Sequence, residues 1–315
     1  MRSILLAVYG VRVKAAHTKR DFELLDSFSD RGVDLFDVLK EILEARKTQE
    51  YRKQDTQQVL QVARLNSSMR RIEGLVEIGQ FGSESDIRNL DRWREIAYKK
   101  RTRDVDLQPF YFLFDVPEGR NLGILLVQRT GIEGVQAILD EALHESFVRD
   151  HPDHRLKMSQ IVPEKLLQQL QGEETKLSEI RFIRHRVPRD ITTVLGPSGT
   201  DQTAGTMELV VRPKEPVFMQ AFRRYIDQHR NVASVLELEE TRFQYDNVKI
   251  KVNVHGKERT MDLADPKRIR ATFDITDEVK LSSAGHPTFK SISEVAKEYL
   301  EDLKDELYGS GGNAP

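Results

Sequence analysis

The sequence predicts an α+β fold, with mixed or antiparallel sheets, flanking helices and two domains. Three observations lead to this prediction. Residues 109–129 have the pattern of a buried β-hairpin, helical spacing follows that hairpin directly, and residues 248–254 alternate strictly between polar and apolar side chains. Strand, turn, strand and helix in this order favour an α+β domain with a mixed or antiparallel sheet.

The segment 109–129 has the clearest core signal. Residues 110–114 are almost continuously aromatic or apolar, which suits a strand buried on both faces. Turn-forming residues at 117–121 separate this strand from a second apolar run at 123–127. Helical spacing then places several apolar side chains on one face, namely Val135, Ile138, Leu139, Ala142 and Phe147.

The N-terminal segment predicts a strand, a helix and a strand pair. Alternation indicates a first strand at about 2–15, and residues 35–43 have the spacing of an amphipathic helix. Residues 45–56 have almost no apolar content, so we expect a loop there. Renewed alternation predicts two antiparallel strands, at about 58–68 and 71–82.

The second half of the chain continues the mixture of strands and helices. Alternation predicts strands at about 156–162, 177–187, 207–212, 248–254 and 269–275, and apolar spacing predicts helices at about 163–171 and 218–226. The chain closes with an amphipathic helix at about 291–307. Ser291 and Glu294 have the spacing of a capping box, so we expect Ser291 to cap this helix.

A length of 315 residues fits two domains. We place the first at 1–172 and the second at 173–308, with the boundary in the polar segment 172–175. Residues 309–315 are rich in glycine and form a flexible tail.

The composition excludes several classes of protein. With no cysteine, the chain has no disulfide framework, thiolate zinc site, iron–sulfur cluster or cysteine nucleophile. No stretch approaches the roughly 18 apolar residues of a membrane-spanning helix, so no membrane insertion is expected. Absence of cysteine also fits a cytoplasmic protein.

Charge is distributed unevenly, although the formal net charge is only -2. Residues 176–270 contain 18 Lys and Arg against 13 Asp and Glu, whereas residues 271–315 contain 4 against 9. A cationic face of a sheet can bind a phosphate backbone. We therefore predict nucleic-acid contacts, each to a phosphate, at Arg184, Arg186, Arg223, Arg224, Lys249 and Lys251. A further cation cluster lies at 99–103.

Two patterns suggest an alternative activity as a nuclease. Arg224 and His229 have a spacing that resembles the Arg-x4–6-His motif of HEPN-type ribonucleases, in which Arg stabilises phosphate charge and His transfers a proton. Here Tyr225 follows the arginine, where that family usually has a polar residue.

The second pattern, Glu278-x-Lys280 with Asp262 upstream, is similar to the metal-binding motif of restriction-type nucleases. Glu278 would lie in a turn after the strand at 269–275. Mg²⁺ is expected only if this alternative holds, and no other cofactor is expected. A zinc site from His144, His151 and His154 is disfavoured, because these residues surround a helix end and a turn.

Two segments resemble uncharacterised bacterial proteins encoded near phage-defence genes. One runs from Asp106 to Phe114 and on through Gly123–Gly131, and the other is Gly285–Phe289 with the closing helix. The resemblance implies a component of an anti-phage defence system, but it assigns no site residues.

The function favoured by the sequence is that of a cytoplasmic protein that binds nucleic acid or another polyanion. One alternative is a non-enzymatic scaffold or homo-oligomer that docks through its acidic closing helix or an exposed strand. The other is a metal-dependent nuclease. Catalytic activity is left open, and a non-enzymatic role is favoured.

Overall fold

The computed structural model describes residues 3–16, 22–130, 135–161, 177–186, 204–212, 214, 235–238, 241–244, 247–254, 257–262 and 272–308. Contacts between residues divide the chain into two compact units, one formed by 1–160 with 276–300 and the other by 161–275 with 301–315. The predicted domain boundary near residue 172 stays a prediction. The two compact units differ from the two predicted domains chiefly because residues 276–300 contact the N-terminal part of the chain.

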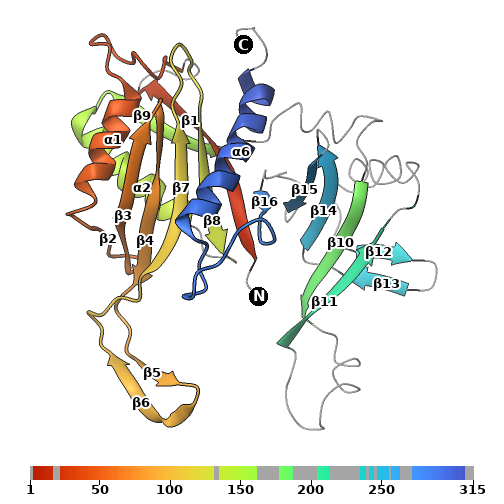
Figure 1. Ribbon diagram of the computed structural model, residues 1–315. Coiled ribbons are helices and arrows are strands. Elements are labelled where there is room, and N and C mark those ends of the chain that lie inside the picture. Colours follow the sequence, from red (N-terminus) through yellow and green to blue (C-terminus); the bar gives the residue numbers. More distant parts are fainter. Residues whose placement is uncertain are drawn as a thin grey trace. The chain divides into compact units, whose positions relative to one another are not determined.

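The predicted α+β class is confirmed, since the described residues form antiparallel sheets and three α-helices (Figure 1). The sheet of the first unit has the spatial order β9-β1-β8-β7-β4-β3-β2. Its strands are β1 (Ile4–Ala15), β2 (Tyr51–Lys53), β3 (Gln58–Ser68), β4 (Arg71–Gln80), β7 (Gln108–Asp115), β8 (Gly123–Thr130) and β9 (His154–Gln160).

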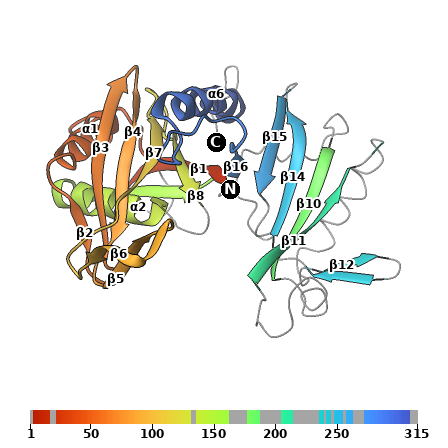
Figure 2. The same cartoon turned by 60° about the horizontal axis from the view of Figure 1, so that its bottom comes forward.

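The predicted β7–β8 hairpin lies in the middle of this sheet, and β7 is buried on both faces as expected. Phe110, Phe112 and Phe114 share one core with α1 (Leu35–Ala45) and α2 (Val135–Asp150). Tyr111 points the other way, to α6 (Phe289–Tyr308), where its ring lies 5.8 Å from that of Phe289. Figure 2 shows α6 over one side of the sheet and α1 and α2 over the other.

A buried polar cluster joins α6 to the sheet. Glu73 on β4 accepts hydrogen bonds from Tyr111 Oη (2.8 Å), Ser293 Oγ (2.7 Å) and Lys297 Nζ (2.9 Å). Burial would raise the pKa of Glu73, but the bonds from Ser293, Lys297 and Tyr111 outweigh it and hold the pKa below its usual value. Glu73 thereby links β4 to α6 and to Tyr111 of β7, so we assign this cluster a structural role.

Two local predictions were wrong. The expected loop at 45–56 contains β2, because Tyr51 is buried opposite Leu60 and donates its hydroxyl to Glu145 (2.8 Å). The closing helix begins at Phe289, so Ser291 lies inside its first turn and does not cap it. Thr288 Oγ1 accepts the Ser291 N–H instead, at 3.4 Å.

In the second unit, five strands pair antiparallel in the order β11-β10-β14-β15-β16, and β12 and β13 form a separate hairpin. Its strands are β10 (Leu177–Arg186), β11 (Ala204–Val211), β12 (Val235–Leu238), β13 (Thr241–Gln244), β14 (Asn247–Val254), β15 (Lys257–Asp262) and β16 (Thr272–Asp274). The predicted helices at 163–171 and 218–226 and the tail lie outside the described residues. Of the helices that are described, none is long and apolar enough to cross a membrane.

Candidate nucleic-acid interface

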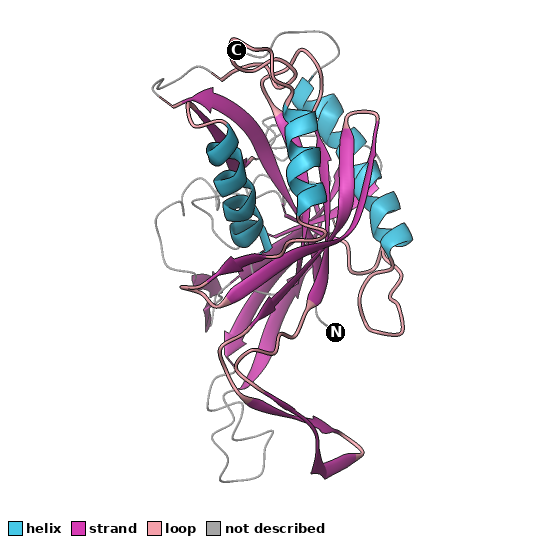
Figure 3. Ribbon diagram, turned by 90° about the vertical axis from the view of Figure 1, so that its left-hand side faces the viewer, coloured by secondary structure: helices cyan, strands magenta, loops and turns pink. Residues whose placement is uncertain are grey.

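A two-stranded hairpin projects from the sheet of the first unit, between β4 and β7 (Figures 1 and 3). It consists of β5 (Ser85–Asn89) and β6 (Arg92–Lys100), and we call it the arm. Because β4 and β7 pair directly, with Ile78 opposite Gln108, a tight turn could have joined them. Residues 81–107 stand there instead, and insertions of this length in a compact unit commonly serve a function.

Local interactions fix the conformation of the arm. Asn89 Oδ1 accepts the backbone N–H of Asp91 at 2.8 Å, which closes the tip. The guanidinium of Arg88 donates to the Trp93 carbonyl at 2.9 Å. At the foot, Lys100 Nζ donates to the Gln80 carbonyl at 3.0 Å, which attaches the arm to the end of β4.

Large apolar side chains lie exposed along the arm. Leu90 at the tip is 86% exposed, Trp93 63% and Tyr98 51%, and Ile87 and Ile96 are about half exposed. Ile87 and Tyr98 are cross-strand partners, so they share one face. Exposed apolar residues that gather on one element, and not singly, indicate a surface that binds a partner.

Cations are interleaved with these apolar residues. The arm, residues 85–100, contains five Lys or Arg and three Asp or Glu, and Arg101, Arg103 and Asp104 follow it. The ion pairs that involve them are long and solvated, at 3.5 Å for Arg88 with Asp86 and 3.7 Å for Arg92 with Glu95. Such pairs contribute little, about 0–1 kcal/mol, so a phosphate can replace the carboxylate at small cost.

The cation cluster at 99–103 was predicted from the sequence, but the arm was not. A signal was present, since apolar residues lie on both sides of the turn-forming segment 89–91. Charged residues between the apolar residues obscured the alternation. Two irregularities in the β5–β6 register also break the period of two.

In the second unit, the predicted cations do not all share one sheet face. Directly opposed residues of antiparallel strands point to the same side, and Lys249 lies opposite Arg181 and Lys251 opposite Glu179. Alternation along β10 puts Arg184 on the other side from Arg181. The structure therefore does not gather Arg184 with Lys249 and Lys251 on one surface.

Carboxylates already contact cations on the Lys249 face. Lys249 Nζ lies 3.2 Å from Asp274 Oδ2, and both side chains are largely buried. Glu179 contacts Arg181 at 2.7 Å and Arg212 at 2.9 Å. Burial would raise the pKa of Glu179, but these two arginines outweigh it and lower that pKa. A phosphate would have to displace Asp274 to reach Lys249.

Several predicted site residues lie outside the part of the chain that the structure describes. They are Arg223, Arg224 and His229, together with the side chains of Arg186 and Asp262. Their roles in phosphate binding, in the HEPN-like pattern and in the magnesium-dependent alternative stay predictions.

The two remaining nuclease candidates both contact α6. Glu278 follows β16 in a turn, as expected, and its Oε1 accepts the Tyr299 hydroxyl at 2.8 Å. The backbone N–H of Lys280 donates to Ser291 Oγ at 3.0 Å, and its side chain is exposed. Among the described residues, no group of three or more His, Asp or Glu could hold a metal ion.

The histidines near the end of α2 have other partners. His144 Nδ1 lies 3.3 Å from a backbone carbonyl, and His154 Nε2 lies 3.3 Å from Glu23 Oε1. The His151 ring packs edge-on against Phe28 at 5.3 Å, where burial lowers its pKa. These contacts place the three histidines in the packing of α2.

No protein-family model matches the chain, and no curated protein shows significant similarity to it. The resemblance to proteins encoded near phage-defence genes, and the defence role that it implies, stay predictions.

Proposed function

We propose that this protein binds nucleic acid and that the arm is its main contact surface. The single observation that carries the proposal is the exposed aromatic and aliphatic side chains of the arm, interleaved with cations, on a hairpin that replaces a tight turn. Cations attract the phosphate backbone, and exposed aromatic rings offer surfaces on which bases stack.

The binding mode that suits the arm best is contact with single-stranded nucleic acid. Trp93 and Tyr98 are both more than half exposed, so a base can reach their rings. Stacking of a base on an aromatic ring contributes about 1–3 kcal/mol and tolerates any sequence. Lys99 and Arg103, for which the described residues show no ion pair, are available for phosphates.

The alternative that uses the same surface is docking to another protein or to a second copy of the chain. An exposed hairpin has an open edge, and edge strands readily pair with other strands. Charge distinguishes the two functions. The surplus of cations on the arm favours a polyanion and opposes pairing with an identical, equally cationic arm.

Fluorescence polarisation with labelled single-stranded and duplex DNA and RNA, at two salt concentrations, tests the proposal. We expect salt-dependent binding by the wild type. Trp93→Ala should weaken it by about tenfold, the equivalent of one lost stacking contact. The triple variant Lys99→Gln, Arg101→Gln, Arg103→Gln should reduce the slope of log affinity against log salt by about two to three.

A matched control removes three cations elsewhere on the first unit, by Lys47→Gln, Arg149→Gln and Lys290→Gln. Each pairs with a neighbouring carboxylate on α1, α2 or α6. This variant should bind like the wild type. Equal losses in both triple variants would show a diffuse charge effect and contradict the assignment to the arm. Absence of salt-dependent binding, with self-association that Trp93→Ala abolishes, would support the protein-docking alternative.

A further inference from the structure

A cavity lies where β7 and β8 separate, at the foot of the arm. Pairing between the two strands stops at Phe112 opposite Val127. Beyond that point, β7 stays with β4 as far as Gln108, whereas β8 stays with β1 as far as Thr130. The strands therefore splay apart, and the space between them is a structural consequence of their different partners.

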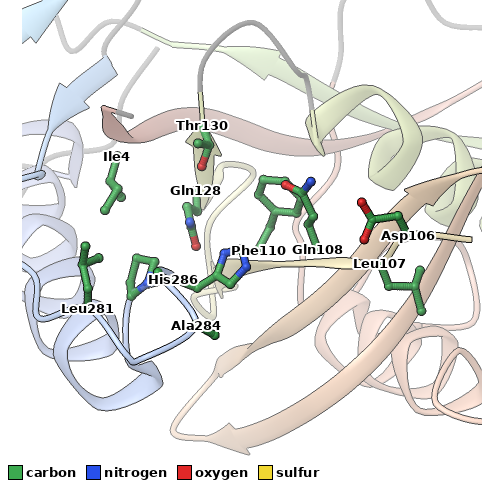
Figure 4. Close-up of a pocket in the computed structure, with 12 residues that line it drawn as sticks. Ile4, Asp106, Leu107, Gln108, Phe110, Gln128, Thr130, Leu281, Ala284 and His286 are labelled. Atoms are coloured by element: carbon green, nitrogen blue, oxygen red, sulfur yellow. The ribbon is translucent and has the colours of Figure 1, made fainter. Parts of the chain in front are cut away.

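The cavity has a volume of about 420 Å³, within the range of about 300–1,000 Å³ that is typical of small-molecule sites. A tight loop closes one side of it, with Leu281 bridged to Pro287 and the Ser282 N–H bonded to the His286 carbonyl at 2.7 Å. Figure 4 shows Gln128, Gln108 and His286 around one space. Side chains of β7, β8 and this loop thus converge there.

Gln128 provides a fixed hydrogen-bond donor in this cavity. Its side chain is only 3% exposed, and its Oε1 accepts the backbone N–H of Tyr111 at 2.9 Å. Because that N–H can only donate, the amide must keep its oxygen toward Tyr111 and its NH₂ group away from it. That NH₂ group has no partner among the described residues, so a ligand that enters the cavity must offer it an acceptor.

The charges of the lining restrict the kind of acceptor. Among the described residues that line the cavity there is no Lys or Arg, whereas Asp106 is acidic. A carboxylate or a phosphate would be repelled by Asp106 and would have no cation to compensate it. The acceptor is therefore a neutral carbonyl oxygen or ring nitrogen, and Asp106 can accept from an N–H of the same ligand.

The apolar lining restricts the ligand further. Ile4, Phe110, Leu281 and Pro287 supply hydrocarbon walls between the polar groups. A flat heterocycle with adjacent acceptors and N–H donors satisfies both the walls and the polar groups, and a nucleobase has this chemistry. The site is also continuous with the arm, since Asp106 and Leu107 belong to the segment that returns from β6 to β7.

We propose that the cavity between β7 and β8 binds a nucleobase, with Gln128 as donor to a ring acceptor and His286 and Gln108 beside it. The base can belong to a free nucleoside or to a strand held by the arm. Only the second source rests on the proposed function.

Calorimetric titration of the full-length protein with adenosine, guanosine, cytidine and uridine tests the cavity itself. At least one nucleoside should bind saturably. Gln128→Glu keeps the acceptor for Tyr111 but removes the donor, so at pH 8 it should weaken binding at least tenfold. His286→Ala, at a position that is not buried, should weaken nucleoside binding several-fold. This second variant tests the cavity if Gln128→Glu fails to fold.

Gln49→Glu introduces the same charge at an exposed position after α1 and should bind nucleosides like the wild type. Saturable binding of no nucleoside at millimolar concentration, or binding that Gln128→Glu leaves unchanged, would overturn the proposal.

A second measurement distinguishes a free nucleoside from a base of a bound strand, and the cavity proposal from the arm proposal. Trp93 is the only tryptophan, so its fluorescence reports on the arm alone. A single-stranded oligonucleotide that contains 2-aminopurine reports on a base withdrawn from its stack. Oligonucleotide binding that needs Trp93 but is indifferent to Gln128→Glu, without nucleoside binding, overturns the cavity proposal only. Nucleoside binding that needs Gln128, without oligonucleotide binding, supports the cavity and overturns the arm.

Discussion

Two hairpins that follow one another in the chain, β5–β6 and β7–β8, have opposite surroundings. Both contain aromatic and branched aliphatic residues, yet Phe110 to Phe114 are almost completely buried, whereas Trp93 and Tyr98 are mostly exposed. The β7–β8 hairpin has a sheet strand on each side and helices over both faces. The arm has only its own two strands.

This difference shows that apolar content alone does not define a core. A two-stranded hairpin is at best marginally stable in water, so the arm depends on its foot and on its tip hydrogen bonds. Its apolar residues contribute little to folding and are available for binding. Those of β7 are committed to stability. Single substitutions in the two hairpins should therefore separate stability from binding.

The largest effect on stability is expected in β7. Phe112 is completely buried and packs edge-on against Phe114 at 5.9 Å. Phe112→Ala should lower the free energy of unfolding by about 3–5 kcal/mol, because it removes buried surface and leaves a cavity. Urea denaturation followed by circular dichroism measures this, and a loss below about 1 kcal/mol would contradict the burial of β7.

A smaller loss is expected where β4 meets α6. Glu73→Ala leaves the buried Tyr111 hydroxyl without its acceptor and should cost about 2–3 kcal/mol at pH 7. Since the folded-state pKa of Glu73 is below 4.5, its contribution is present above pH 4.5 and is lost as the pH falls through the folded pKa. The difference in stability between wild type and variant should therefore narrow as the pH falls below 4.5. The exposed Glu95→Ala is the control, and a constant gap between wild type and Glu73→Ala across this range would contradict the prediction.

A still smaller loss of stability is expected at the tip of the β3–β4 hairpin. Arg70 Nε donates to the Val116 carbonyl at 2.8 Å, and its guanidinium pairs with Asp34, whose Oδ1 also accepts the Phe36 N–H at the start of α1. Arg70→Ala should cost about 1–2 kcal/mol. Met69 beside it is 90% exposed, so Met69→Ala should change stability by less than about 0.5 kcal/mol. Equal effects of the two variants in thermal or urea unfolding would contradict this anchoring role.

The smallest effect on stability is expected in the arm. Trp93→Ala should change the free energy of unfolding by less than about 0.5 kcal/mol, although it should weaken nucleic-acid binding. In the free wild-type protein, Trp93 should fluoresce like a solvated indole and be quenched readily by acrylamide. A blue-shifted, protected emission would show that the arm packs against another surface.

The sequence predicted the elements with strong periodicity well. The first strand, the strand pair at 58–82 and α2 are confirmed, because their side chains alternate or repeat with the period of the element. The β7–β8 hairpin is confirmed as well, although continuous apolar runs on both sides of turn residues predicted it. Failures occurred where a tertiary partner decides the outcome. Tyr51 forms a strand because Leu60 lies opposite it, and Thr288 replaces Ser291 as the capping residue because α6 begins earlier.

The candidate sites were much less predictable. Counting cations along the chain could not show that Lys249 pairs with Asp274, or that Arg184 points away from Lys249, because both depend on strand register. Nor does any pattern around Gln128 indicate that β7 and β8 separate there. That separation follows from the pairing of β7 with β4 and of β8 with β1, which no local segment specifies.

The sequence by itself determined the α+β class, most of the strands and helices of the first unit, and the chemical character of each segment. Hydrophobic periodicity is a local property, so it can be recognised from the sequence alone. Only the tertiary structure decided which apolar residues are buried, which cations are already paired and where strands separate to leave a cavity. Burial and pairing depend on residues distant in the sequence, and the arm and the cavity therefore emerged only when those residues were brought together.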